Sequence, residues 1–469
     1  MNRGSHGSKS SAARSLVTWG NRFSLLIVLA FFTSAARLDA DGSNLSRILG
    51  FYHWGGRYAT SVAQGVEQIA ALGGKLARLT LSSRYYSDYN LGSGCLPGLS
   101  LSDIAKADDV KRALDNEQIE VFMLTSYDAT SFGDCLHHLY LNPGFYTTAN
   151  VAALIKEYSD FTLYLYQTYR NTHKRFILSS WEGDNAVYCG AAQRYATDSV
   201  FRAECSRYLS EYSGNQSPEE SIRGLTLWFQ FVQQGIDDGR RRALDLGIGA
   251  KRVYFAPEFS AVHILHDAGF KSVLYDVLPK LAFDYVSYSS YESINQPEPD
   301  KALIADLNLI QDIIGSNAII LGEVGFAQSA WGRDRVIARL DSVINAGVSW
   351  GVSYIFHWNV YDQSVIDDFG IYDVVGQPTA LQEYYKQRIK TRDSNGSLVE
   401  PIGRFPCRRP CRQNGCYAGL ELPFTEFATG ADVDLPACYS CQRGRWTPQP
   451  PSETHYLRKT GALPLAHVL

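Results

Sequence analysis

Phe176-Ile-Leu-Ser-Ser-Trp-Glu182 and Ala318-Ile-Ile-Leu-Gly-Glu323 are two short apolar stretches of this chain, and each ends in a glutamate. Continuous apolar runs of this length are typical of strands that are buried on both faces of a parallel sheet. A carboxylate at the end of such a strand is costly to desolvate, and groups of this kind concentrate where chemistry takes place. The two stretches therefore predict a parallel sheet with a pair of acidic groups at one edge.

Six further apolar runs share this character and bring the total to eight. The runs are Ile48–Tyr52, Leu76–Leu81, Ile119–Leu124, Phe176–Leu178, Arg252–Ala256, Phe283–Tyr288, Ala318–Leu321 and Gly351–Phe356. Helical patterns such as Ser61–Leu72, Val151–Arg170, Ala302–Ile314 and Asp334–Ala346 lie between them, and Ser217-Pro218 begins another with a capping box. Strands that alternate with helices imply βαβ units. The fold class predicted is α/β, a (β/α)8 TIM barrel rather than an open doubly wound sheet.

The ends of the chain have a different composition from the barrel. Arginines and a lysine precede the apolar run Phe23–Phe32, which small residues follow. This run is shorter than the roughly 20 residues that span a bilayer, so we expect a signal peptide over residues 1–40 and a secreted protein without stable membrane insertion. A retained membrane anchor is the alternative. Residues 41–390 are expected to form the barrel, and residues 391–469 a linker and a small cysteine-rich appendage.

Nine cysteines fit an oxidising compartment. We expect Cys95–Cys135 and Cys189–Cys205 to pair within the barrel, although the sequence does not fix the connectivity. The tail cysteines have the spacing C-x3-C-x4-C-x21-C-x2-C from residue 407 to residue 441, with no histidine between them, which favours disulfides over zinc. Their odd number leaves one thiol free or bonded to another chain. Triplets beginning at residues 44, 215 and 395 are potential glycosylation sites.

Two carboxylates are the minimum equipment for hydrolysing a glycosidic bond, one as an acid and one as a nucleophile about 5–5.5 Å away. Strands four and seven of an eight-stranded barrel lie nearly opposite each other, so Glu182 and Glu323 are predicted to face one another across the mouth. Trp181 helps to desolvate Glu182 in this interpretation. A net charge of −4 argues against nucleic acid, and neither a metal nor an organic cofactor is implied.

Four motifs fall on the fourth, seventh and eighth strands and just beyond them. They are Ser180-Trp-Glu182-Gly-Asp-Asn185, Leu321-Gly-Glu323-Val-Gly325, Phe356-His-Trp358-Asn359 and Phe369-Gly-Ile-Tyr-Asp-Val-Val-Gly-Gln-Pro378-Thr. In these motifs the chain resembles the clan A retaining glycoside hydrolases over residues 47–390. The resemblance implies that Glu182 is the acid/base and Glu323 the nucleophile. It also implies that Trp358 floors the sugar site, that Arg78 steadies Glu323, and that Tyr288 hydrogen-bonds it.

The chain departs from that family directly before the acid/base. Most members have asparagine there to hold the sugar's 2-hydroxyl, whereas this chain has Trp181. Either Ser180, Asp184 or Asn185 takes that role, or the chemistry is altered. His53, Trp54 and His357 are further candidates for lining the pocket, Glu258 is a candidate for substrate contact, and Asp362 is a weaker one.

These patterns predict a secreted retaining glycoside hydrolase that cleaves β-linked poly- or oligosaccharides. A carbohydrate-binding barrel that has lost the chemistry is the alternative. A metal-dependent TIM-barrel hydrolase is disfavoured, because the ten histidines include no H-x-H or clustered pair after a strand.

Overall fold

The computed structural model describes residues 45–390, except 56–60, 90, 93–94, 97, 133–136, 216 and 250–251, and also three short strands of the tail. These three, β10 (Gly415–Cys416), β11 (Cys438–Gln442) and β12 (Arg445–Pro448), form a small antiparallel sheet. The predicted signal peptide, the remaining tail and Cys135 lie outside the described residues. Within the described part of the chain, every helix is too short or too polar to cross a bilayer.

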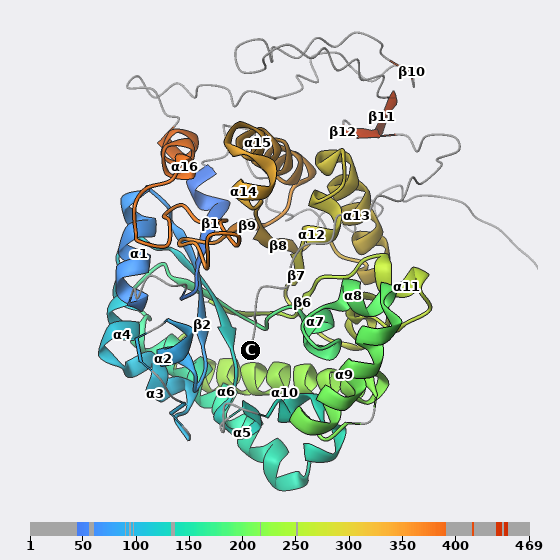
Figure 1. Cartoon of the computed structure of the whole chain (residues 1–469). Helices are drawn as coiled ribbons and strands as arrows, with labels where there is room; N and C mark the ends of the chain where they lie inside the picture. Colours follow the sequence, from blue (N-terminus) through green and yellow to red (C-terminus); the bar gives the residue numbers. More distant parts are fainter. Residues whose placement is uncertain are drawn as a thin grey trace, which may run out of the picture. The chain divides into compact units, whose positions relative to one another are not determined.

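A ring of parallel strands forms the centre of the fold (Figure 1). The strands are β1 (Leu49–His53), β2 (Leu76–Leu81), β3 (Val121–Ser126), β4 (Arg175–Ser179), β5 (Val253–Ala256), β6 (Glu258–Phe259), β7 (Val286–Ser289), β8 (Ile319–Val324) and β9 (Tyr354–Trp358). Their order is β5-β4-β3-β2-β1-β9-β8-β7-β6. Only Pro257, which has no N–H for a ladder, separates β5 from β6. The two edges are halves of one strand, so the predicted eight-stranded barrel is confirmed.

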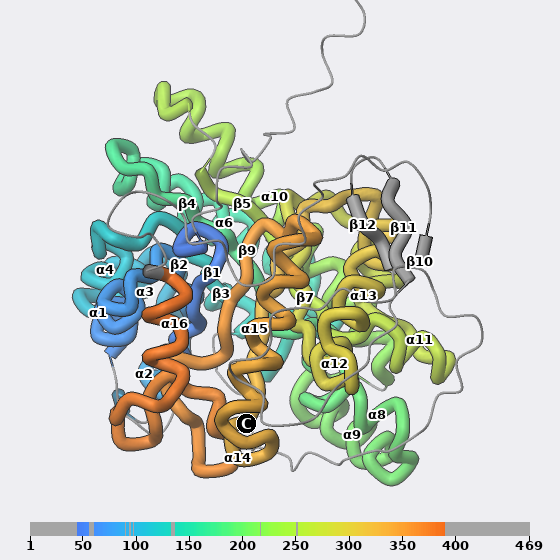
Figure 2. Tube along the Cα trace, turned by 90° about the horizontal axis from the view of Figure 1, so that it is seen from above, coloured from blue at the N-terminus to red at the C-terminus, as the bar shows by residue number. Residues whose placement is uncertain are grey.

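Helices surround the strands in both views (Figures 1 and 2). The longer ones are α1 (Val62–Ala71), α4 (Asp108–Asp115), α6 (Thr148–Thr168), α9 (Ser199–Tyr212), α10 (Pro218–Asp245), α13 (Pro299–Ile314), α15 (Arg333–Trp350) and α16 (Ala380–Lys390). The shorter ones are α2 (Tyr85–Asp88), α3 (Leu101–Lys106), α5 (Ala129–Phe132), α7 (Gly183–Val187), α8 (Ala192–Thr197), α11 (Ile264–Asp267), α12 (Tyr291–Ile294) and α14 (Gln328–Trp331). As predicted, Ser217 caps α10 by accepting the N–H of Glu220, and Pro218 follows it.

Each strand sends alternate side chains into the barrel and out to the helices. The lower interior is apolar and is built from Leu76, Val121, Met123, Ile177, Ala256, Ile320, Tyr354 and Phe356. The side chains between these positions, such as Phe51, Leu79 and Phe176, pack into the larger core under the helices. Because both faces are buried, the strands show no simple alternation of polar and apolar residues.

A bulge in β8 breaks this alternation at the second glutamate. Tyr288 pairs with Leu321, but the next residue, Ser289, pairs with Glu323, so Gly322 is an extra residue. Leu321 and Val324 both belong to the outer core, which leaves Gly322 and Glu323 for the interior. Without the bulge, the glutamate would point away from the mouth.

Substituting Gly322→Ala tests how tightly the interior is packed at this bulge. A Cβ there would lie 2.1 Å from Glu258 Oε2 and 2.1 Å from Ser287 Oγ, so these buried polar groups would have to move. We expect the free energy of unfolding to fall by at least about 2 kcal/mol in urea titrations. Gly249→Ala is the control, because a Cβ at that glycine meets nothing within 4 Å. Equal stability of the two variants would contradict the packing described.

Candidate active site

A buried ion pair lies above the apolar layer of the barrel. Arg78 of β2 and Glu258 of β6 are both fully buried, and the guanidinium donates Nη1 to Oε2 at 2.7 Å and Nη2 to Oε1 at 2.8 Å. Arg78 also donates to Thr125 Oγ1 at 3.1 and 3.0 Å, and to the carbonyl of Gly322 at 2.9 Å. Its guanidinium lies 4.3 Å from the ring centre of Tyr52. This bidentate geometry compensates two charges that would be very costly to bury alone.

Glu258 is enclosed by donors on all sides. Besides Arg78, it accepts the hydroxyl of Ser287 at 2.6 Å and the backbone N–H of Glu182 at 3.2 Å. The predicted role of Glu258 in substrate contact is therefore wrong, because its oxygens are used within the protein and its side chain has no exposed surface. Instead, Glu258 fixes the backbone at the end of the fourth strand.

Glu182 follows β4 and precedes α7, with 4% of its surface exposed. Its carboxylate accepts hydrogen bonds from the hydroxyl of Ser289 at Oε1 and from the amide of Asn185 at Oε2. Burial raises the pKa of Glu182 to about 7, and the negative charge of Glu258 adds to the increase, while the two hydrogen bonds and Arg78 oppose it. The carboxyl group is therefore poised to give or take a proton near neutral pH.

Glu323 projects from the bulge of β8 into the same space. Its Oε1 lies 3.5 Å from Arg78 Nη1 and has no hydrogen-bond partner among the described residues. Burial raises its pKa well above the ordinary range, repulsion from Glu182 adds to this, and Arg78 opposes it. Burial thus acts on both carboxyl groups, so the pair shares a proton rather than ionising fully. The contact of Glu323 with Arg78 that the resemblance implies is present as an ion pair at 3.5 Å.

The tyrosine beside the carboxylates is Tyr291, not Tyr288. Tyr288 points outward, where its hydroxyl contacts Ser293 at 2.6 Å and donates to Asp306 at 3.0 Å, so its predicted bond to Glu323 is contradicted. Tyr291 begins α12, and burial raises its pKa with further contributions from Glu323 and Glu182. Alternation along β7 identifies the error, because Ser287 and Ser289 already occupy the inward positions.

Two tryptophans stand together at the ends of β1 and β9. The ring centres of Trp54 and Trp358 are 5.7 Å apart with an angle of 31° between the planes, and both side chains are partly exposed. Asn359 bonds the backbone N–H and carbonyl of Trp54, each at 3.3 Å. The peptide bond between Trp358 and Asn359 is cis. Flat apolar rings of this kind bind the faces of sugar rings well.

The two predicted histidines point away from the interior. His53 Nε2 contacts the carbonyl of Ser61 at 3.1 Å, and His357 contacts the carbonyl of Phe369 at 2.9 Å and the hydroxyl of Tyr385 at 2.8 Å. Burial lowers the pKa of each histidine to about 4. The prediction that they line the pocket is wrong. Each histidine directly precedes a tryptophan, Trp54 or Trp358, and points to the opposite side of the strand.

The polar residues beside the acid/base position make different contacts, which distinguish their roles. Asp184 accepts three backbone N–H groups, from Ser260, Ala261 and Val273, and Ser180 Oγ accepts the N–H of Glu258, so both are structural. Asn185 contacts Glu182 itself. Trp181 is half-buried and donates its backbone N–H to the hydroxyl of Tyr127 at 3.0 Å.

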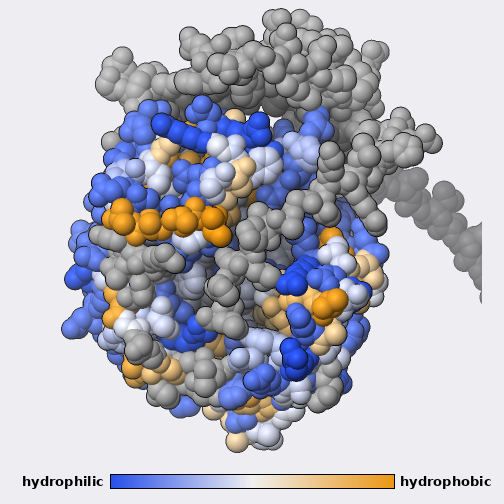
Figure 3. All heavy atoms as spheres, in the orientation of Figure 1, coloured by the Kyte–Doolittle hydropathy of each residue, from blue (hydrophilic) through white to orange (hydrophobic). Residues whose placement is uncertain are grey.

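The segment after β9 crosses the same end of the barrel. Gln363 donates to the carbonyl of Trp54 at 3.5 Å, Asp362 accepts the N–H of Gly370 at 2.5 Å, and Asp367 lies close enough to add to the raised pKa of Glu323. Burial raises the pKa of Asp362 to about 7. This segment also carries three exposed apolar residues, Val365, Ile366 and Val375. Figure 3 shows apolar patches among hydrophilic side chains on one face of the molecule.

The disulfide and glycosylation predictions have different outcomes. Cys189 and Cys205 are bonded, as predicted. Cys95 is also disulfide-bonded, but the predicted partner lies outside the described residues. Asn215 is buried, and its amide donates to the carbonyl of Leu141 and to Ser221, so it is not accessible to a glycan in the folded chain.

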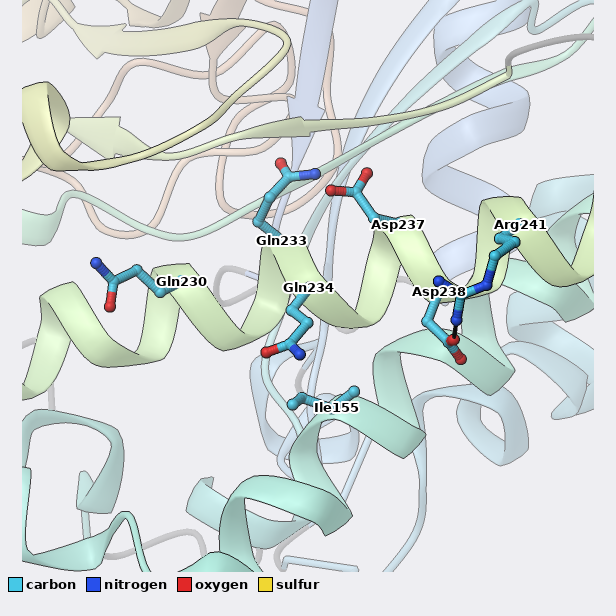
Figure 4. Close-up of a pocket in the computed structure, with 7 residues that line it drawn as sticks. All are labelled: Ile155, Gln230, Gln233, Gln234, Asp237, Asp238 and Arg241. Atoms are coloured by element: carbon cyan, nitrogen blue, oxygen red, sulfur yellow. Dashed lines mark hydrogen bonds and ion pairs between the residues drawn. The ribbon is translucent and has the colours of Figure 1, made fainter.

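A hollow of about 340 Å³ lies on the outside of the barrel, between α6 and α10 (Figure 4). It is lined by Ile155, Gln230, Gln233, Gln234, Asp237, Asp238 and Arg241. Gln234 points toward Ile155, while Gln233 and Asp237 project from the other side of α10. None of the residues predicted for the site lines this hollow. Among the described residues, no group of three or more histidine, cysteine or acidic side chains forms a candidate metal site.

No family model matches the chain, and none of the curated proteins is similar to it. Among solved structures, a rice β-glucosidase is 9% identical over 73% of this chain and 97% of that chain, with a TM-score of 0.47. A GH5_18 protein from Bifidobacterium longum subsp. infantis is 12% identical over 75% and 85%, with a TM-score of 0.45. The family 1 β-glucosidase from Thermotoga maritima is 10% identical over 74% and 97%, with a TM-score of 0.47.

Substituting Glu182→Gln should flatten the pH dependence of stability. Because the folded pKa is raised from 4.5 to about 7, the folded chain holds a proton that the unfolded chain has released, and stability falls as pH rises through this window. We expect Glu182→Gln to be more stable than the unmodified chain at pH 8, by up to about 3 kcal/mol, and to lose this advantage near pH 4. Urea unfolding at several pH values measures it. Glu383→Gln, at an exposed site on α16, should show no such trend.

Proposed function

We propose that the protein is a secreted retaining glycoside hydrolase that acts on β-linked poly- or oligosaccharides. The observation that carries the proposal is the meeting of Glu182 and Glu323 beside one buried arginine at the mouth of the barrel. Two carboxyl groups that influence each other's ionisation, with tryptophan rings at the same end, fit the hydrolysis of a bond between sugars. The apolar run near the N-terminus supports secretion.

The contacts suggest a role for each group in a double displacement. Glu182, protonated near neutral pH, gives its proton to the oxygen of the leaving sugar. Once Glu182 holds the proton, its charge no longer repels Glu323, and Arg78, 3.5 Å from Oε1, favours the Glu323 carboxylate. This carboxylate attacks the anomeric carbon and forms a glycosyl ester. Glu182 then takes a proton from water, which attacks the anomeric carbon and releases the Glu323 carboxylate. Trp54 and Trp358 hold the sugar ring by stacking.

Glu182→Gln should affect substrates according to their leaving group. For natural glycosides, whose leaving oxygen needs protonation, we expect kcat/KM to fall by about 10²–10⁴. For dinitrophenyl glycosides, which leave without a proton, glycosylation should be nearly unchanged. The value of kcat/KM on both classes measures this, because it reports the glycosylation step alone, after a screen of β-glucans, xylan, mannan and glycolipids has identified the sugar. Equal losses on both classes would argue against Glu182 as the acid.

Glu323→Gln should abolish turnover of every substrate while preserving the fold. A 2-fluoro glycoside of the identified sugar should label the unmodified chain once, at Glu323, as intact-mass and peptide measurements would show. The Glu323→Gln variant should not be labelled. If the unmodified chain binds oligosaccharides but neither turns them over nor becomes labelled, the alternative of a non-catalytic carbohydrate-binding barrel replaces this proposal.

A further inference from the structure

The side chain of Asn185 connects Glu182 to a segment outside the barrel. Its Oδ1 accepts the backbone N–H of Ala192 at 2.8 Å, and its Nδ2 donates to Glu182 Oε2. A backbone N–H only donates and a carboxylate oxygen accepts, so these two partners determine which way the amide faces. Ala192 therefore selects the orientation in which Asn185 presents a donor to Glu182.

Ala192 is held in turn by a covalently closed turn. The helix α7 ends at Val187, Tyr188 is its C-cap, and Cys189 and Gly190 follow with positive φ values of 57° and 82°. Gly190 donates its N–H to the carbonyl of Asn185 at 2.7 Å, and this bond caps the end of the helix. Cys189 is bonded to the buried Cys205 of α9. The disulfide thus restrains the turn that places the N–H of Ala192.

We propose that Asn185 is a positioning residue that tunes how readily Glu182 releases its proton, and that the Cys189–Cys205 disulfide maintains this tuning. The effect of Asn185 on the Glu182 proton does not depend on the proposed function; only the catalytic use of that proton rests on it.

Several groups face Glu182, and only Asn185 depends on the disulfide-linked turn. Ser289 of β7 donates to the other carboxylate oxygen, and Arg78 supplies positive charge. Glu258 and Glu323 oppose ionisation because their negative charges repel that of Glu182. Tyr291 adds no charge, because burial raises its pKa and keeps the phenol neutral. Apart from Asn185, these groups lie on strands of the barrel or, for Tyr291, on α12. Removing the Asn185 donor therefore removes a group that stabilises the Glu182 anion, while the negative charges that destabilise this anion remain in place.

Asn185→Ala tests the link directly. The carboxyl signals of ¹³C-glutamate-labelled protein, with Glu182 assigned through Glu182→Gln, give its titration midpoint without any substrate. We expect the midpoint to rise by about one pH unit, a tenfold change in proton affinity that corresponds to one hydrogen bond to a charged group. The basic limb of the kcat/KM profile should move by the same amount. Asn185→Ser replaces the alanine variant should that variant fail to fold.

Two further variants separate tuning from general loosening. Asn142→Ala breaks the 2.7 Å bond from the Asn142 amide to the carbonyl of Ser213, the residue that follows α9. This variant should leave the Glu182 midpoint unchanged. Cys189→Ser/Cys205→Ser should raise the midpoint, and should add little once Asn185 is alanine. An unchanged midpoint in Asn185→Ala, or an equal rise in Asn142→Ala, overturns the proposal. Because the titration needs no activity, an inactive chain with a shifted midpoint would refute the proposed function alone.

Discussion

The bidentate pair between Arg78 and Glu258 is the interaction on which the rest of the site depends. One guanidinium bonds side chains or carbonyls from β3, β6 and β8 as well as from the end of β4. Removing one partner of such a pair leaves a buried charge without compensation, at a cost of about 3–5 kcal/mol. The strands of the barrel are therefore joined in the interior by this buried ion pair as well as by the apolar layer.

Both glutamates of the proposed mechanism take their positions from this pair. Glu258 accepts the backbone N–H of Glu182, and Arg78 lies 3.5 Å from Glu323. The bulge in β8 and the absence of a side chain at Gly322 give Glu323 its inward direction and give the ion pair its room. The buried carboxylate of Glu258 thus sets the geometry of the two carboxyl groups to which we assign the chemistry.

The sequence was sufficient for the eight strands and for the two glutamates at their ends, because long buried runs and strand order are strong signals. It was insufficient for the direction of individual side chains. Tyr288, His53 and His357 point outward, since strands that are apolar on both faces hide their alternation, and one residue of phase reverses a side chain. The enclosure of Glu258 depends on Arg78, 180 residues away, which no local pattern specifies. The contact of Asn185 with Glu182 spans only three residues, but it requires knowing that α7 begins directly after Glu182.

Pro257 interrupts the fifth strand of the barrel and divides it into β5 and β6. Here β6 contributes two residues to the pairing with β7, and the carbonyl of Phe255 in β5 accepts the N–H groups of Asp284 and Tyr285, just before β7. The backbone pairing is shortest here, but the side chains of the paired residues Glu258 and Ser287 are also bonded to each other at 2.6 Å. A polar contact in the interior therefore supplements the backbone ladder at the place where the ladder is shortest.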